Sequence, residues 1–268
     1  SVSVSVSVSV SVSVGVSVCV CVRVRVRVCV RACESVGAGT RAGVRSGARG
    51  YRKPMLQHAL RHGTALIPHT MGMLIITSTD RFFLTHYQGA EETGVYWLGY
   101  QFGYAVTLVA DAYNRAFSPW LYARLAANVV KERAAIVRRV YRFFGAMALL
   151  AAVLVLGTPR TTRGVLPAEF LGIQDFAYWI ILGFALNGMY RVVAGFVFYA
   201  ERTKTISAIT LCAAACNVGL NALWVPDLGA TGAAQATAVS FGIGFVLTWM
   251  AAQRAHPMPW FTLARPSA

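Results

Sequence analysis

Six long apolar segments follow one another from residue 56 onward, and they constrain the fold more than any other feature of the chain. A helix crosses a bilayer with about 20 consecutive apolar residues, and each segment is close to that length. Charged residues make up only 13% of the 268 residues, whereas about a quarter is typical of soluble proteins. The sequence therefore predicts an all-α membrane protein with six transmembrane helices within 54–256, namely 56–79, 94–117, 141–158, 176–199, 204–225 and 229–251.

The charges between these segments predict how the helices are oriented. Loop 118–140 carries five basic residues and one acidic residue, whereas loop 86–93 carries Glu91 and Glu92 and neither Lys nor Arg. Because cytoplasmic loops of membrane proteins are enriched in Lys and Arg, the basic loop is expected on the cytoplasmic side. An even number of crossings then places both termini, including the tail 257–268, in the cytoplasm. We expect a multi-pass protein of the bacterial cytoplasmic (inner) membrane.

Residues 1–53 form a leader whose composition differs from that of the rest of the chain. Val alternates with Ser, Cys or Arg over most of 1–32, and a period of two is typical of a strand. So long a strand has neither a turn nor a partner in the sequence. Gly, Ala, Ser and Arg dominate 33–53, a composition typical of disordered linkers. We expect the leader to be disordered, and its repeat is typical of translated simple-repeat DNA rather than of a functional domain.

Composition and motifs exclude several classes of function. The net charge of +15 is concentrated in the leader and in loop 118–140, so the bilayer rather than nucleic acid is the expected partner. The six Cys lack the paired spacing of a zinc site. The sequence contains no nucleotide-binding loop, no G-x-S-x-G and no His-Glu metal helix. We therefore expect no enzyme activity, no cofactor and no bound metal.

Several short motifs occur together over residues 54–260: DRFFL at 80–84, GVY at 94–96, FSPW at 117–120, NxxxN at 217–221, GATGAAQAT at 229–237 and PMPW at 257–260. Together they resemble the lipid-linked oligosaccharide flippases of the multidrug/oligosaccharidyl-lipid/polysaccharide exporter superfamily, and most closely the O-antigen flippases. Members of that family have about twelve or more helices in two pseudo-symmetric halves, an arrangement common among transporters. The resemblance implies one lobe of a MATE-like transporter, the C-terminal half, with an N-terminal half as its missing partner.

The resemblance also implies a substrate and a reaction. The family moves a polyprenyl pyrophosphate bearing an oligosaccharide, such as an O-antigen unit, from the cytoplasmic to the outer leaflet by alternating access. Two alternatives stay open. A cation-coupled multidrug exporter of the same superfamily would favour acidic residues in its cavity, and a truncated fragment would be inactive because half of the cavity is absent.

Three arginines lie within or beside the apolar segments and are the candidates for binding the pyrophosphate: Arg81, Arg115 and Arg191. A charge at membrane depth costs about 3 kcal/mol on insertion scales, so such residues usually face a wet cavity or a partner helix. The planar guanidinium group can pair with two phosphate oxygens at once. Asp111 lies four residues before Arg115 and is expected to pair with it on one helix face. Asp80 is expected to cap its helix or to pair with Arg81.

Neutral polar side chains in the same segments are the candidates for contacts with sugar hydroxyl groups. Tyr100 and Gln101 lie in the second segment, and Asn187 lies one turn before Arg191. The two asparagines of the NxxxN motif at 217–221 share a helix face, and we expect them to bond to a neighbouring helix.

Small residues four apart predict where helix backbones approach each other closely. Gly99 and Gly103 have this spacing in the second segment. In the last segment the same spacing relates Gly232, Ala236, Ser240 and Gly244. We expect both stripes to face other helices.

Overall fold

The computed structural model of the chain describes residues 3–10, 22–29, 53–127, 130–165 and 167–260. These residues belong to two compact units, Ser1–Gly50 and Tyr51–Ala268, and each unit is described by itself. Of the predicted tail 257–268, residues 261–268 lie outside the described residues.

In the first unit, part of the alternating sequence forms a two-stranded antiparallel sheet. Strand β1 (Ser3–Val10) pairs with β2 (Val22–Cys29), so that Val residues lie opposite Val residues and Ser residues lie opposite Arg or Cys. β-Branched residues favour strands, and the segment is long enough to fold back on itself. The prediction that a strand in the leader lacks a partner is therefore wrong for these residues. Of the linker 33–53, expected to be disordered, residues 33–52 lie outside the described residues and Lys53 begins a helix.

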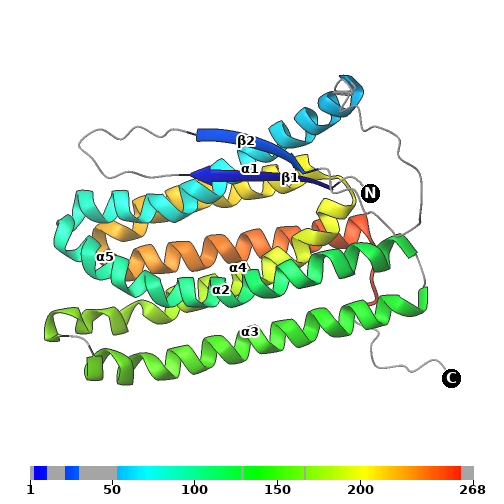
Figure 1. Cartoon of the computed structure of the whole chain (residues 1–268). Helices are drawn as coiled ribbons and strands as arrows, with labels where there is room; N and C mark the ends of the chain where they lie inside the picture. Colours follow the sequence, from blue (N-terminus) through cyan, green and yellow to red (C-terminus); the bar gives the residue numbers. More distant parts are fainter. Residues whose placement is uncertain (1–2, 11–21, 30–52, 128–129, 166, 261–268) are drawn as a thin grey trace, which may run out of the picture. The chain divides into compact units, whose positions relative to one another are not determined.

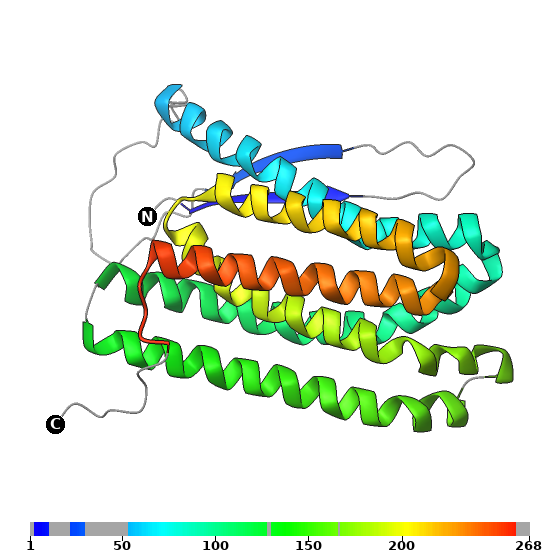
Figure 2. The same cartoon turned by 180° about the vertical axis from the view of Figure 1, so that it is seen from behind.

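The second unit is built of helices, which Figure 1 and Figure 2 show from opposite sides. Its elements are α1 (Lys53–Tyr87), α2 (Gly89–Ala127), α3 (Val130–Val165), the 3₁₀ helix η1 (Ala168–Asp175), α4 (Ala177–Tyr199) and α5 (Thr203–Ala255). The six predicted apolar segments lie in these helices, except for Phe176, which directly precedes α4. Every element described in this unit is a helix, so the predicted all-α fold is confirmed for it.

The helices extend beyond the predicted segments. The predicted loop 118–140 is wrong, because α2 continues to Ala127 and α3 begins at Val130. Ala, Arg and Leu recur in this stretch and have high helix propensities, so the helices continue after the apolar sequence ends. The basic residues of the predicted loop thus lie on helix ends.

Helix α5 consists of two antiparallel arms, 203–228 and 230–255, which meet at Gly229 (Figure 2). Gly229 has φ 53° and ψ −133°, a conformation that side chains with a Cβ rarely adopt. A Cβ at Gly232 would lie 2.5 Å from the carbonyl oxygen of Trp224, so the return of the chain also needs a small residue there. The two arms contain the predicted segments 204–225 and 229–251, apart from the turn residue itself.

Glycines allow α2 to approach the segment that contains η1 and α4. A Cβ at Gly103 would lie 2.4 Å from Cδ2 of Phe184, and one at Gly99 would lie 2.5 Å from Cε2 of Phe176. The prediction that these two glycines mark a close helix contact is confirmed.

The substitution Gly103→Ala is therefore expected to lower the free energy of unfolding by about 1–3 kcal/mol, because the new methyl group overlaps the Phe184 ring. Gly145→Ala is the matched control, since a Cβ at Gly145 meets nothing within 4 Å. Both substitutions gain about 0.5–1 kcal/mol of helix propensity. The difference between their free energies of unfolding therefore isolates the cost of the overlap with Phe184. Unfolding of the purified protein in detergent micelles measures both values, and equal stability of the two variants would contradict the contact.

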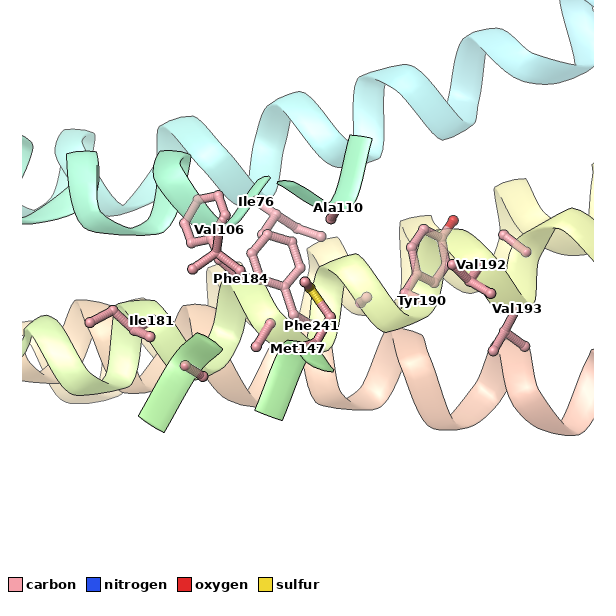
Figure 3. Close-up of a cluster of buried hydrophobic side chains, with 14 of the residues drawn as sticks. Ile76, Val106, Ala110, Met147, Ile181, Phe184, Tyr190, Val192, Val193 and Phe241 are labelled. Atoms are coloured by element: carbon pink, nitrogen blue, oxygen red, sulfur yellow. The ribbon is translucent and has the colours of Figure 1, made fainter. Parts of the chain in front are cut away.

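The apolar core is centred on α4, most of which is buried between α2, α3 and α5. Figure 3 shows the middle of this core, to which five helices contribute: Ile76 of α1, Val106 of α2, Met147 of α3, Phe184 of α4 and Phe241 of α5. The core therefore joins helices that are far apart in sequence.

The outer surface of the second unit is also apolar in places. Leu149, Val153 and Leu156 follow one face of α3 and are 67%, 58% and 69% exposed. Within the described residues, three helical stretches are long and apolar enough to cross a membrane: Glu132–Gly164, Ala177–Tyr199 and Thr203–Ala255. Exposed aliphatic faces on such helices are stable against hydrocarbon. Helices α1 and α2 are less apolar because they carry the polar side chains described next.

Candidate functional site

A carboxylate with no exposed surface, that of Asp80 in α1, lies where α1 meets α2 and both arms of α5. It accepts hydrogen bonds from Oη of Tyr96 in α2 at 2.9 Å and from Nδ2 of Asn221 in the first arm of α5 at 3.0 Å. Oγ1 of Thr237 in the second arm donates a third, at 2.5 Å. The donors come from three different helical segments, so the site exists only once the helices have packed.

Asn217 completes this group, which we call the Asp80 cluster: Asp80, Tyr96, Asn217, Asn221 and Thr237. Nδ2 of Asn221 also donates to Oδ1 of Asn217 at 3.2 Å. Oδ1 of Asn221 and Nδ2 of Asn217 are buried and have no hydrogen-bond partner in the described part of the chain. The prediction that the NxxxN motif bonds to a neighbouring helix is confirmed for Asn221, which bonds to α1.

All donors to Asp80 are neutral groups, and neither of the ion pairs found in the described ranges involves it. An ionised carboxylate that is buried without a positive partner is strongly unfavourable. The cluster is therefore suited to hold a proton or a small cation. Its ligand atoms are carboxylate, amide and hydroxyl oxygens, which hard cations prefer, and its single negative charge matches a monovalent ion. Over the described ranges, His, Cys, Asp and Glu form no group of three or more that could hold a metal ion.

Asp80 neither pairs with Arg81 nor caps α1, which continues to Tyr87, so both parts of that prediction are wrong. Adjacent residues of a helix do not face each other, and the two side chains point to different surroundings. Cζ of Arg81 lies 3.8 Å from the ring centre of Trp97 and 5.1 Å from that of Tyr100, both in α2. Nε and Nη2 of Arg81 are buried and have no hydrogen-bond partner among the described residues. The guanidinium group is thus held by aromatic faces while one of its edges keeps two free donors.

The second predicted pairing is also wrong, because Asp111 pairs with Arg191 rather than with Arg115. Oδ1 of Asp111 in α2 accepts from Nη1 of Arg191 in α4, and both side chains are about one-third exposed, at 36% and 32%. Nε of Arg191 donates to Oδ1 of Asn187 at 3.0 Å. At 1.5 Å per residue, Asp111 lies about 33 Å from Gly89 and about 24 Å from Ala127 along α2. The pair is therefore far from both ends of the helix.

The structure separates the other predicted site residues. Arg115 and Gln101 are exposed on α2 and join neither polar group. Tyr100 is buried against Phe184, with 4.9 Å between ring centres, and its hydroxyl group has no partner among the described residues. Sequence reasoning missed Tyr96 and Thr237 as hydrogen-bond donors to Asp80. Both residues lie in the motifs given above, GVY and GATGAAQAT, but no local spacing relates them to Asp80.

A further polar contact joins α1 to the first arm of α5. Nδ1 of His69 and Oγ1 of Thr210 are 2.8 Å apart and share a hydrogen bond. The His69 ring also lies 6.4 Å from that of Tyr190 in α4. This contact and the Asp80 cluster both link α1 to α5.

Comparison with known proteins identifies two relatives in Haemophilus influenzae (strain Rd). The chain is 22% identical over 161 residues to a protein described as Lsg locus putative protein 1. This match covers 57% of this chain and 38% of that relative. It is 24% identical over 145 residues to an uncharacterized membrane protein, covering 51% of this chain and 33% of the relative. The matches thus span 38% and 33% of the relatives' length. No family model and no solved structure matches the chain.

The fold and the relatives together indicate which class of protein this is. Long apolar helices with exposed aliphatic faces enclose polar side chains, and a relative is named a membrane protein. The chain is an α-helical membrane protein.

Proposed function

We propose that the chain is the C-terminal lobe of a flippase that moves polyprenyl-pyrophosphate-linked oligosaccharide, such as an O-antigen unit, across the bacterial cytoplasmic membrane. The observation that carries this proposal is that two donors of Arg81 are buried and unpaired. Its Nε and Nη2 atoms lie on the same edge of the guanidinium plane, and neither has an acceptor among the residues that the structure describes. Such an edge is the fork that pairs with two oxygens of a phosphate group. The motifs shared with O-antigen flippases support the same substrate class.

The proposed arrangement in the membrane has six crossings with both termini in the cytoplasm. Helices α3, α4 and α5 supply the apolar lengths, and α1 and α2 cross with Asp80 and Asp111 turned toward other helices. The basic residues at the adjoining ends of α2 and α3 support a cytoplasmic location of that end. In such a lobe, Asp80, Asp111 and Arg191 lie between helices rather than in hydrocarbon.

The proposed transport cycle uses the polar groups in separate roles. Arg81 binds the pyrophosphate, and a phosphate oxygen competes with Asp111 for Arg191 when the substrate reaches the middle of the membrane. Gln101, which is exposed, contacts sugar hydroxyl groups, and the buried Tyr100 and Asn187 contact them only when α2 and α4 separate during the cycle. A proton or cation at Asp80 changes the charge between α1 and α5 and thereby favours one of two conformations. A second lobe, the missing N-terminal half, closes the path on the other side.

The Asp80 cluster favours a second candidate, the lobe of a cation-coupled multidrug exporter. Such a carrier needs a buried acidic residue that exchanges an ion during the cycle, and Asp80 has the required burial. An inactive truncated fragment is the third, because the chain matches only 38% and 33% of its two relatives.

Complementation tests the first proposal. In a bacterial strain that lacks its own O-antigen flippase, the chain is expressed alone and together with the N-terminal half of a flippase, and surface polysaccharide is measured. We expect restoration with the second half present, a loss of at least about tenfold on Arg81→Ala and a smaller loss on Arg81→Lys, which keeps the charge but not the fork. Arg160→Ala, an exposed arginine at the far end of α3, is the control.

Full restoration by Arg81→Ala would contradict the role of Arg81 in binding pyrophosphate. Efflux of a cationic dye that depends on Asp80, without any effect on polysaccharide, would favour the exporter. Failure of every combination to restore either activity would support the inactive fragment.

A further inference from the structure

A cavity at the surface of the helical unit lies between α2 and α3, which run side by side (Figure 1). Its volume is about 330 Å³. We call it the α2–α3 groove, and the residues that line it include Tyr113 and Phe117 of α2 and Arg139, Arg142, Phe143 and Ala146 of α3. None of the described residues that line it is acidic, so the two arginines make the groove positively charged.

Both arginines of the groove are available to a ligand. Arg139 and Arg142 are neighbours on one face of α3, and both side chains are exposed. Neither takes part in an ion pair or a side-chain hydrogen bond with any residue that the structure describes. Cζ of Arg139 lies 4.0 Å from the ring centre of Trp120 in α2. This contact uses the face of the guanidinium group, whereas its N–H bonds lie in the plane and stay free to donate.

The floor of the groove is a stack of aromatic rings. The ring of Tyr113 lies 4.2 Å from that of Phe143 and 5.4 Å from that of Phe117, and the planes are nearly parallel in both pairs. Phe117 and Phe143 are buried, and so is Oη of Tyr113, which therefore offers no donor to the groove. A ligand that fills the groove needs an apolar part to cover these rings as well as a negative charge.

The sequence of α3 places Arg142 at the edge of the hydrocarbon region. Residues 143–159 carry no charge and span about 26 Å at 1.5 Å per residue, close to the thickness of about 30 Å of a bilayer core. Ala146, Leu149, Val153 and Leu156 follow Arg142 at spacings of four and three residues, so they share its face of α3, and all are exposed. This aliphatic face runs from the groove into the hydrocarbon.

We propose that the α2–α3 groove binds one anionic phospholipid. The guanidinium N–H groups of Arg139 and Arg142 donate to its phosphate oxygens, and an acyl chain covers the aromatic floor and follows the aliphatic face of α3. Basic pockets between transmembrane helices are typical sites for anionic lipids. A free phosphate ion would leave the floor and the aliphatic face uncovered, so the apolar surface favours a lipid.

The inference rests on the membrane class of the protein and not on the transported substrate. The residues of the groove belong neither to the Asp80 cluster nor to the pair of Asp111 and Arg191. A lipid held there joins α2 to α3 and is expected to stabilise the folded chain.

Thermal unfolding of the purified full chain in a neutral detergent tests the site. Phosphatidylglycerol, phosphatidylcholine and inorganic phosphate are added separately, and the midpoint of unfolding is measured against concentration. We expect only phosphatidylglycerol to raise the midpoint. The double variant Arg139→Gln/Arg142→Gln is expected to weaken its apparent affinity at least about tenfold, as for the loss of a charge-assisted hydrogen bond. Arg254→Gln removes a charge from an exposed position at the end of α5, outside the groove, and is expected to change the affinity less than about twofold.

The variant Ala146→Phe tests the apolar part and gives an independent reading if the double variant does not fold. Its ring fills the groove while both arginines remain, and we expect the affinity for phosphatidylglycerol to fall at least about fivefold. Ala148→Phe is the matched control, because Ala148 is exposed on α3 but does not line the groove.

Equal stabilisation by phosphatidylcholine, or equal weakening by Arg254→Gln, would overturn the proposal. Stabilisation by inorganic phosphate that the double variant abolishes would identify a free phosphate site and overturn the assignment to a lipid. The same affinity in Ala146→Phe and Ala148→Phe would contradict the path of the acyl chain.

Discussion

Asp80→Ala is expected to lower the free energy of unfolding by about 3 kcal/mol or more, since each buried polar group left without a partner costs about 1–3 kcal/mol. The substitution removes the acceptor of Tyr96, Asn221 and Thr237 at once. Asp80→Asn is expected to cost less. The amide keeps one acceptor oxygen, and the hydroxyl groups of Tyr96 and Thr237 can rotate to accept hydrogen bonds from its NH₂ group. Both variants are expected to lose any transport that depends on ion exchange at this position.

Unfolding in mixed detergent micelles measures the stability of these variants. Asp175→Ala is the matched control, because Asp175 is an exposed aspartate at the end of η1 and is expected to change stability by less than about 0.5 kcal/mol. If Asp80→Ala unfolded like Asp175→Ala, Asp80 would not be the buried junction of α1, α2 and α5. If Asp80→Asn transported normally, an ion at Asp80 would not drive the cycle.

The pair of Asp111 and Arg191 is expected to show a coupling energy of about 2–3 kcal/mol in a double-mutant cycle. Either single substitution, Asp111→Ala or Arg191→Ala, leaves the other charge far from both helix ends without its partner, which is strongly destabilising. The double variant removes both charges and is expected to recover much of the lost stability. The second ion pair, Arg124 with Glu132, lies at helix ends and is expected to couple by less than about 1 kcal/mol.

The same double variant separates a structural from a functional role of Arg191. If Arg191 binds pyrophosphate, the Asp111→Ala/Arg191→Ala variant folds but does not restore surface polysaccharide. If Asp111 and Arg191 only compensate each other's charge, the double variant is stable and restores surface polysaccharide. A coupling energy equal to that of Arg124 and Glu132 would mean that α2 and α4 do not depend on this ion pair.

The helical architecture was largely predictable because apolar length is a local property of the sequence. Segments of about 20 apolar residues form helices regardless of what they contact. A break between the last two segments was predicted at 226–228, whereas the structure keeps these residues helical and turns the chain at Gly229. The ends of α2 and α3 were not predicted, because good helix formers continue a helix into water beyond its apolar part.

The partners of the charged residues could not be derived in the same way. Spacing along one helix suggested Asp111 with Arg115, yet Asp111 contacts Arg191, which lies in α4, three elements later in the chain. Adjacent positions suggested Asp80 with Arg81, yet Asp80 bonds to α2 and to both arms of α5. In both cases the competing partner is remote in sequence and close only after the helices have packed.

The sequence by itself determined that this chain is helical and apolar enough for a membrane, and which ionisable groups stand within apolar segments. These are properties of composition and local order, and they hold before any helix meets another. Only the tertiary structure decided that Asp80 is enclosed by neutral donors, that Arg81 rests on aromatic rings and that Arg191 is compensated. Hydrogen bonds and ion pairs act over a few ångströms, so their partners are chosen by helix packing rather than by distance along the chain.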